Sequence, residues 1–274
     1  MNILVCLKQI LDPEIPPRDF RVDTERMEAQ RGSAGLVMNI FCANALETAL
    51  QFRERSGGKI TAISFGNDTA EEILRKALAL RVDSAVLVVQ DPAPEHLRSR
   101  RAEPMFVARV MAAAARKLGT FDLILTGREA GDWGEGQTGG LLAEELGMPC
   151  VSFAENFERS PSNPKALLAR RQIESGIEVL EAICPFVATV TNHEHNVPRI
   201  AKTRDVMMAY RQPLTRLTMA ELGVNPESQA NVAAEVAGLT LPVKESRCDF
   251  AVGETLDQRV GVFAEKIVAV IRSA

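Results

Sequence analysis

Short runs of consecutive apolar residues, many of them β-branched, alternate with helical patterns through the first two thirds of the chain. The runs cover residues 3–7, 60–65, 85–89, 123–126 and 186–191. Strands covered on both faces are apolar at successive positions, so these runs predict a buried parallel sheet. The alternation itself is typical of βαβ units.

Between these runs, apolar residues recur at spacings of three and four, which predicts helices over residues 44–55, 69–80, 104–118 and 137–146. Asp68 is the expected N-cap of the second helix, because Glu71 follows at the third helical position. Gly119 is the expected C-cap of the third. The pattern as a whole predicts an α/β fold, a Rossmann-like parallel sheet with helices on both faces.

Two segments break this alternation. Residues 11–35 are long, charged and proline-containing, which predicts an excursion or hairpin outside the sheet. Residues 166–173 and 177–183 are separated by a turn that contains Gly176, so they predict a β-hairpin.

After residue 213 the pattern fades, with few signals over residues 225–246 and an expected helix over 255–271. We expect a nucleotide-binding α/β domain at residues 1–212 and a C-terminal arm at 213–274 that packs on another chain. A peripheral lobe on the same chain is the alternative.

Composition excludes several classes of protein. The chain has 274 residues, of which 46% are hydrophobic and 25% charged, values that argue against disordered, collagen-like and disulfide-scaffold proteins. The net charge of -4 gives no general attraction to nucleic acid. The five cysteines are scattered and form no C-x-x-C pair, which argues against a zinc ribbon or an iron-sulfur cluster. With no basic n-region and no apolar run of about 18 residues, we expect a cytoplasmic protein that is not integral to a membrane.

The glycine-rich segment that starts at Gly127, between a strand and a helix, is the strongest chemical signal. Its glycines let the backbone approach a ligand, and the free N–H groups of the next helix favour a phosphate. Gly134, Gly136 and Gly139 satisfy G-x-G-x-x-G, yet that fingerprint should open directly after the strand. We therefore expect no standard nicotinamide site, and a simple turn is the alternative to a phosphate loop.

Other candidate groups lie at strand ends and in polar segments. Phe65, followed by Gly66, ends a predicted strand, where it would stack on an adenine or belong to the core. His96 lies in a polar segment, and His193 and His195 follow a strand without a matching third ligand, which favours a polar loop over a metal site. G-x-S-x-G, G-x-x-x-x-G-K-[ST] and H-E-x-x-H are absent from the sequence, so we expect no catalytic residue.

The segment from Arg199 to Arg216 is basic in an acidic protein. It holds five basic residues, Arg199, Lys202, Arg204, Arg211 and Arg216, against the single acid Asp205. Such a local excess of charge is consistent with a docking surface, although a run of charged residues is usually a solvated face.

Taken in order, several of these segments resemble the β subunit of electron transfer flavoprotein, including its FixA-like members. They are the opening strand with its lysine at residues 3–8, Val37 to Cys42 leading into residues 45–47, the loop from Thr126 through residues 137–139, and the hairpin stretch 169–180 continuing to 185–189. The resemblance covers most of residues 1–212.

The resemblance implies a heterodimer with an α subunit that holds the redox-active FAD, part of whose surroundings this chain supplies. It also implies that this chain binds AMP or, in electron-bifurcating members, a second FAD that accepts hydride from NADH. The implied redox partners are dehydrogenases and quinone oxidoreductases. Together with Gly66 and Gly139, which are taken from their positions, the implied cofactor-binding residues are Cys6, Asn39, Ile40, Phe41, Cys42, Phe65, Gly127, Arg128, Glu129, Ala130, Gly131, Asp132, Trp133, Gly134, Glu135, Gly136, Gln137 and Thr138.

The family's partner-recognition loop falls on residues 196–211, with Arg199, Lys202, Thr203, Arg204 and Met207 as docking residues. Thr203 stands where the family often has a leucine that inserts into acyl-CoA dehydrogenases.

Residues 132–136 replace the family's acidic, asparagine-bearing stretch, which leaves AMP and FAD both open.

Two other functions remain open from the residues alone. An ATP-using enzyme of similar α/β architecture would need a serine- and glycine-rich loop after the first strand, where residues 8–13 stand instead. A nucleotide-sensing module that acts without a partner is the second. Such a sensor would be colourless and stable alone, whereas a carrier subunit would purify with a yellow partner.

Overall fold

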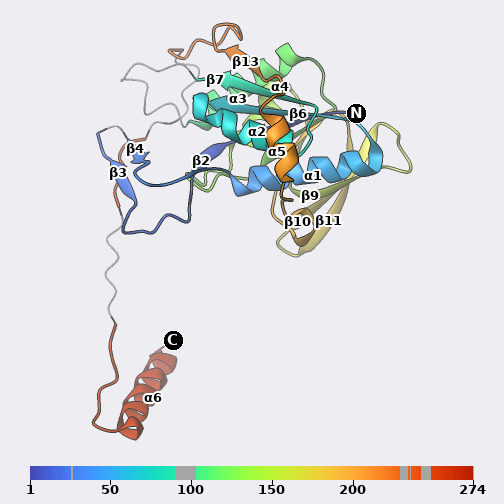
Figure 1. The fold of residues 1–274 in the computed structure, drawn as a ribbon. Helices are drawn as coiled ribbons and strands as arrows, with labels where there is room; N and C mark the ends of the chain where they lie inside the picture. Colours follow the sequence, from blue (N-terminus) through green and yellow to red (C-terminus); the bar gives the residue numbers. More distant parts are fainter. Residues whose placement is uncertain (26, 91–102, 229–233, 235, 242–247, 274) are drawn as a thin grey trace. The chain divides into compact units, whose positions relative to one another are not determined.

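The computed structural model describes residues 1–25, 27–90, 103–228, 234, 236–241 and 248–273. Its centre is a nine-stranded sheet with the order β11-β10-β9-β12-β8-β1-β6-β7-β13 (Figure 1). The strands are β1 (Asn2–Leu7), β6 (Lys59–Gly66), β7 (Ser84–Val89), β8 (Leu123–Gly127), β9 (Cys150–Arg159), β10 (Ala166–Ile173), β11 (Gly176–Ile183), β12 (Phe186–Val190) and β13 (Thr215–Thr218).

In this spatial order, the seven strands from β9 to β13 pair in parallel. β10 and β11 extend the sheet beyond β9 as an antiparallel hairpin. From β1 the chain builds outward through β6 and β7, then returns to the other side of β1 to form β8. The strand order therefore reverses between β1 and β8. In open α/β sheets, ligands bind outside the carboxyl ends of the strands at such a reversal.

Helices cover both faces of the sheet. One core cluster packs α1 (Ile40–Ser56), α2 (Glu71–Ala79) and part of α5 (Thr203–Ala209) on one face. The other packs α3 (Pro104–Leu118) and α4 (Thr138–Leu146) on the opposite face. This arrangement confirms the predicted Rossmann-like α/β class, and it accounts for strand interiors that are apolar at successive positions.

The five predicted sheet strands and the predicted hairpin are confirmed. The helix predicted over residues 104–118 is present with the predicted ends, and the other predicted helices are present with shifted ends. The predicted cap at Asp68 is wrong. Asn67 occupies the cap instead, with its side chain accepting a bond from the Thr69 N–H, and residues Asp68–Ala70 form a 3-10 turn (η1) before α2. The predicted C-cap Gly119 is confirmed, since its N–H donates to the Ala115 carbonyl.

The segment between β1 and α1 forms the expected excursion. β2 (Gln9–Leu11) pairs with β5 (Leu36–Met38), and β3 (Arg21–Asp23) pairs with β4 (Glu28–Gln30), each as a separate two-stranded antiparallel sheet. These two ladders lie outside the nine-stranded sheet and lead the chain into α1.

The chain divides into two compact units, Met1–Leu239 and Thr240–Ala274. The division falls later than the expected boundary at residue 213 because β13 pairs with β7 and extends the sheet. The second unit contains α6 (Leu256–Ser273). His96 and parts of residues 225–246 lie outside the described residues.

In the part of the chain that the structure describes, no helix combines the length and the hydropathy that crossing a bilayer requires.

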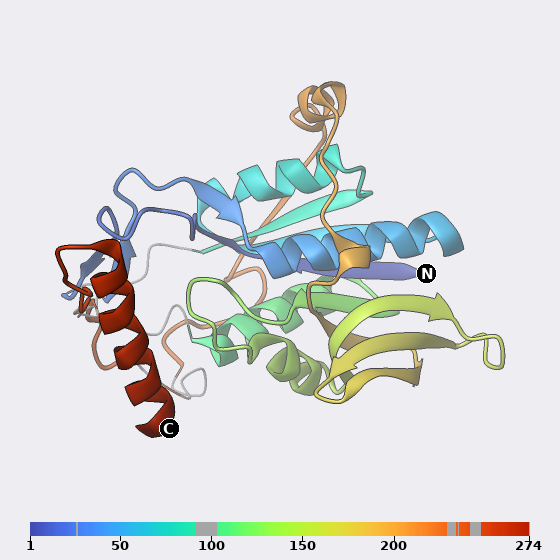
Figure 2. The same cartoon turned by 90° about the horizontal axis from the view of Figure 1, so that it is seen from below.

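The chain crosses α1 directly after β12, through a short 3-10 turn, η3 (Glu194–Asn196) (Figure 2). Asn196 is fully buried and fixes this crossing. Its Nδ2 donates to the Thr191 carbonyl at 2.9 Å, and Asn44 of α1 donates to the Asn196 carbonyl at 2.9 Å. The turn is therefore held to both the sheet and the helix.

The first turn of α4 rests so closely on the sheet that only glycine fits at its second residue. A Cβ at Gly139 would collide with the Thr189 side chain and lie 2.6 Å from Thr126 Oγ1, whereas a Cβ at Gly140 would meet nothing within 4 Å. A side chain at Gly139 should therefore lower the free energy of unfolding, whereas a side chain at Gly140 should not.

We predict that Gly139→Ala lowers the free energy of unfolding by about 1–3 kcal/mol through overpacking. Gly140→Ala is the matched control and should raise it by up to about 1 kcal/mol, because alanine favours the helix. Urea denaturation of both variants measures the difference. Equal effects at the two positions would contradict the packing that places α4 against β8 and β12.

Candidate functional site

One buried side chain joins three segments at the switch point between β1 and β8. Asn39 is 1% exposed, and its backbone N–H donates to the Lys8 carbonyl just beyond β1 at 2.9 Å. Its Nδ2 donates to the Glu129 carbonyl at 2.8 Å, and its Oδ1 accepts from the Gly131 N–H at 3.1 Å. The start of α1 is thereby tied to the end of β1 and to the loop that follows β8.

A glycine lets α1 approach β8 closely. A Cβ at Gly127 would lie 2.9 Å from the backbone of Phe41 and Cys42, in the first turn of α1. A side chain at this position would push the helix away from the strand end. Together with Gly139 at the other end of the loop, Gly127 fixes where the loop leaves the sheet and where it re-enters a helix.

The positive charges near the loop are already paired with acids. The Arg128 guanidinium lies 4.4 Å from the Phe41 ring centroid and forms an ion pair with Glu129 at 2.8 Å. Lys8 Nζ lies 2.7 Å from Asp132 Oδ1. These pairs are partly exposed, so each contributes little to stability, but they order the loop and neutralise it.

The N-terminus of α4 is open to an anion. Its first turn contains no acidic residue, and Gln137 at its cap makes no side-chain capping bond. The first N–H groups of any helix lack acceptors within the helix and carry a partial positive charge. Beside this helix end, Thr126 Oγ1 is buried and has no hydrogen-bond partner among the residues that the structure describes. A buried hydroxyl without a partner costs free energy, which a ligand oxygen in reach would recover.

The two cysteines near the strand ends are not reactive groups. Burial raises the pKa of the Cys6 thiol, and the neighbouring Cys42 raises it further. Burial also raises the pKa of the Cys42 thiol, outweighing its bond from Asn39. Both therefore stay neutral at physiological pH and line the site as small apolar groups.

The remaining predicted residues of the loop and of α1 lie at the surface or start the next helix. Gly134 closes a turn with its N–H donating to the Ala130 carbonyl at 2.8 Å, and the Trp133 N–H donates to Asp132. Trp133 and Ile40 are 36% and 53% exposed. Glu135 and Gly136 are exposed beyond this turn, and Thr138 is the first residue of α4.

Phe65 and Gly66 end β6, as expected, but Phe65 packs edge-on against Phe106 of α3 with 5.8 Å between ring centroids.

The basic segment that starts at Arg199 is partly neutralised. Arg199 forms ion pairs with Glu47 and Glu54 of α1, and Arg216 forms ion pairs with Asp68 and Glu71. The predicted docking residues Lys202, Thr203 and Arg204 are exposed, and Met207 is 67% exposed. The cationic surface is therefore smaller than the sequence suggests.

Sequence reasoning alone missed three contributors to this site. In the sequence, Thr126 has the pattern of an ordinary strand residue, and only the close approach of Gly139 to its hydroxyl in the folded chain places it beside the helix end. The bond between Lys8 and Asp132 joins residues 124 apart, and the Arg128 Nη1 bond to Thr191 Oγ1 joins residues 63 apart. The available signal in the sequence was indirect: the apolar runs and the glycine loop indicate a parallel sheet in which β1 and β8 are neighbours, and that pairing brings these distant residues together.

A parallel sheet with a glycine-bounded loop and an open helix end at its switch point defines a Rossmann-like α/β protein of the ligand-binding kind. The family model of the electron transfer flavoprotein domain matches residues 29–222. The chain belongs to the electron transfer flavoprotein β-subunit family. Membership implies association with FAD and with an α subunit.

Relatives match nearly the whole chain. The caffeyl-CoA reductase-Etf complex subunit CarD of Acetobacterium woodii is 30% identical over 270 residues, covering 97% of this chain and 98% of the relative. The electron transfer flavoprotein subunit beta of Bacillus subtilis is 29% identical over 274 residues, covering 100% and 98%. The mitochondrial subunit of Oryza sativa is 32% identical over 245 residues, covering 89% and 90%.

We predict that Asn39→Asp destabilises the chain by about 1–3 kcal/mol, because the buried carboxylate loses the Nδ2 donor and faces the Glu129 carbonyl. Asn67→Asp is the matched control. Asn67 acts only as an acceptor for Thr69, so the aspartate keeps the bond and the variant should lie within about 0.5 kcal/mol of the native chain. Thermal melts compare the two, and equal losses would reject the role assigned to Asn39.

Proposed function

We propose that this chain is the β subunit of a heterodimeric electron transfer flavoprotein that binds an adenine nucleotide, AMP or a second FAD, in the loop between β8 and α4. The observation that carries the proposal is the open N-terminus of α4 beside the unpartnered Thr126 hydroxyl. In the same proposal, the heterodimer carries electrons from dehydrogenases to an acceptor such as a quinone oxidoreductase.

The residues present fit a nucleotide phosphate. The N–H groups of Thr138, Gly139 and Gly140 start α4 and would donate to phosphate oxygens, with the Thr126 hydroxyl as a further donor. Lys8 and Arg128 are paired with acids, so the attraction for the phosphate charge would come from the helix end. Bound flavin would supply the redox chemistry, and this chain would bind and orient it.

The other predicted contacts would surround the rest of the nucleotide. Cys6 and Cys42 give neutral, compact walls at the strand ends, and Asn39 holds the loop in place. Phe65 keeps its proposed place beside an adenine only if its ring contacts both Phe106 and the base. AMP and FAD share the adenylate portion, so these contacts serve either nucleotide.

The C-terminal unit supports the proposed contact with an α subunit. Leu256, Val260, Phe263, Ile267 and Ile271 recur at helical spacing along α6, and all are between 43% and 71% exposed. An apolar stripe of this kind needs a covering surface. We propose that the α subunit provides this surface, and that residues 213–274 pack on it. A cytoplasmic location also stays a prediction from the sequence.

We predict that Thr126→Val weakens nucleotide binding about 10- to 100-fold, because valine keeps the shape but removes the hydroxyl donor to a charged phosphate. Thr126→Ser, which keeps the hydroxyl, is the control and should retain the nucleotide. The measurement is chromatography of nucleotides released from the co-expressed complex, with the flavin-to-heterodimer ratio. A ratio near one with AMP supports a structural nucleotide, and a ratio near two without AMP supports a second FAD. Full retention by the valine variant would reject the site.

We expect a redox partner to dock on Lys202 and Arg204, the exposed cations of this segment for which the described residues supply no ion pair. We predict that Lys202→Glu with Arg204→Glu slows reduction of the acceptor at low salt by about tenfold or more, while the flavin content stays native. Lys59→Glu with Lys165→Glu, an equal change of charge at other exposed sites, is the control. Stopped-flow reduction at several salt concentrations measures the effect. The same rate for both double variants would reject docking on this segment and favour an ordinary solvated face.

A further inference from the structure

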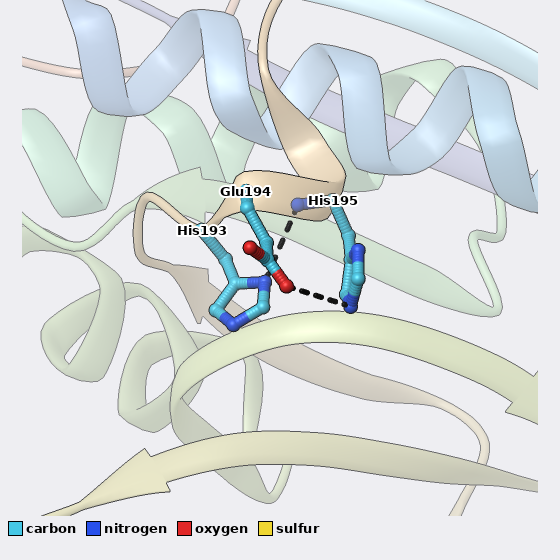
Figure 3. A group of neighbouring side chains, drawn as sticks. All are labelled: His193, Glu194 and His195. Atoms are coloured by element: carbon cyan, nitrogen blue, oxygen red, sulfur yellow. Dashed lines mark hydrogen bonds and ion pairs between the residues drawn. The ribbon is translucent and has the colours of Figure 1, made fainter.

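Metal-ligating side chains converge where the chain crosses α1. One ligand atom from each of His193, Glu194 and His195 lies within 4.8 Å of the others. Figure 3 shows the three side chains side by side, with the Glu194 carboxylate 3.7 Å from His195 Nε2, and the centroids of the two imidazole rings are 4.6 Å apart. Neighbouring residues of a helix normally point in different directions. The tight η3 turn instead directs three consecutive side chains to one place.

A buried carboxylate stands behind the first histidine. The Glu155 side chain on β9 is 0% exposed, and its Oε2 lies 3.6 Å from His193 Nε2. The Nδ1 atom of His193 accepts a long bond, 3.3 Å, from the His195 N–H. This arrangement places the ring proton on Nε2, facing Glu155. The lone pair of Nδ1 is directed toward His195 and engaged only by this long bond, so a metal ion bound at Nδ1 would replace the His195 N–H as its partner, as in a carboxylate–histidine–metal arrangement.

The backbone that carries these ligands is fixed before any ion binds. Asn196, the last residue of η3, accepts from the His193 N–H at 2.8 Å and donates to the Thr191 carbonyl. Asn44 of α1 holds the same residue from the other side. A metal ion would therefore order only the side chains, which lowers the entropic cost of binding.

We propose that His193 Nδ1, the Glu194 carboxylate and His195 Nε2 bind one Zn²⁺ ion, with Glu155 as the positioning residue for His193. Two imidazole nitrogens and a carboxylate oxygen are ligands that zinc takes at about 2.0–2.2 Å, in a tetrahedron whose fourth position is left to water. The ligand atoms must close by about 1 Å or more to meet that geometry. The exposed side chains of Glu194 and His195, at 78% and 60%, have room to rotate.

The site differs from the polar loop that the sequence favoured. The sequence shows two histidines two residues apart with no third ligand in a recognised pattern. The carboxylate of Glu155 lies 38 residues before His193 and meets it only because β9 pairs with β12. The proposal does not depend on nucleotide or electron-carrier function.

The test uses the full chain without a histidine tag, in the assembly in which it purifies and after removal of metal. Isothermal titration with zinc sulfate should give one ion per chain. Glu155→Gln should weaken the affinity about 10- to 100-fold, and His195→Asn at least as much. His96→Asn, which changes the third histidine, is the matched control and should bind as the native chain does. Zinc X-ray absorption should show only nitrogen and oxygen neighbours.

Two results would overturn the proposal. One is equal zinc affinity of the native chain and a double variant with His193→Asn and His195→Asn. The other is a sulfur neighbour in the absorption spectrum, which would assign the ion to one of the five cysteines. Since His195 is 60% exposed, His195→Asn should fold even if Glu155→Gln does not, so the proposal can be tested in either case.

Discussion

The end of strand β8 lies between two helices at distances that leave no room for a side chain. Gly127 meets the start of α1, and Gly139 brings the start of α4 against Thr126 and Thr189. The loop between these two contacts is fixed at both ends, and Asn39 holds its middle. The position of the open helix end, and with it the whole candidate site, depends on these two close approaches.

Under the proposed function, the site would attract an anion through its backbone rather than through side-chain charge. Its lysine and arginine are each bonded to an acid, and its cysteine thiols are neutral. Backbone N–H groups have fixed directions, so they discriminate by the position of a ligand oxygen as well as by its charge. The proposed phosphate site would therefore need no exposed basic patch in a protein with a net charge of -4.

Local patterns predicted the parts of the fold that depend on neighbouring residues. The hairpin of β10 and β11 follows from alternation around Gly176, and α3 begins at its expected proline. β9 was missed because Phe153 has a positive φ of 56° and its register with β12 is irregular. β13 was missed because four residues carry too little periodicity.

The candidate site was predictable only in part for the same physical reason. The glycine loop is contiguous in sequence, so composition and position revealed it. Asn39 and Glu129 are 90 residues apart, and nothing in either neighbourhood specifies their bond. Arg199 likewise reads as a free surface cation until folding places it beside Glu47, 152 residues away.

The exposed apolar stripe of α6 has a consequence for the life of the chain in a cell. While Val260, Phe263 and Ile267 face water, this unit presents the kind of surface that chaperones and proteases recognise and that promotes aggregation. Copies made in excess of whatever covers the stripe would be removed or lost to aggregates. Selection would therefore favour coupled synthesis of this chain and its covering partner, so that the amount of one sets the useful amount of the other.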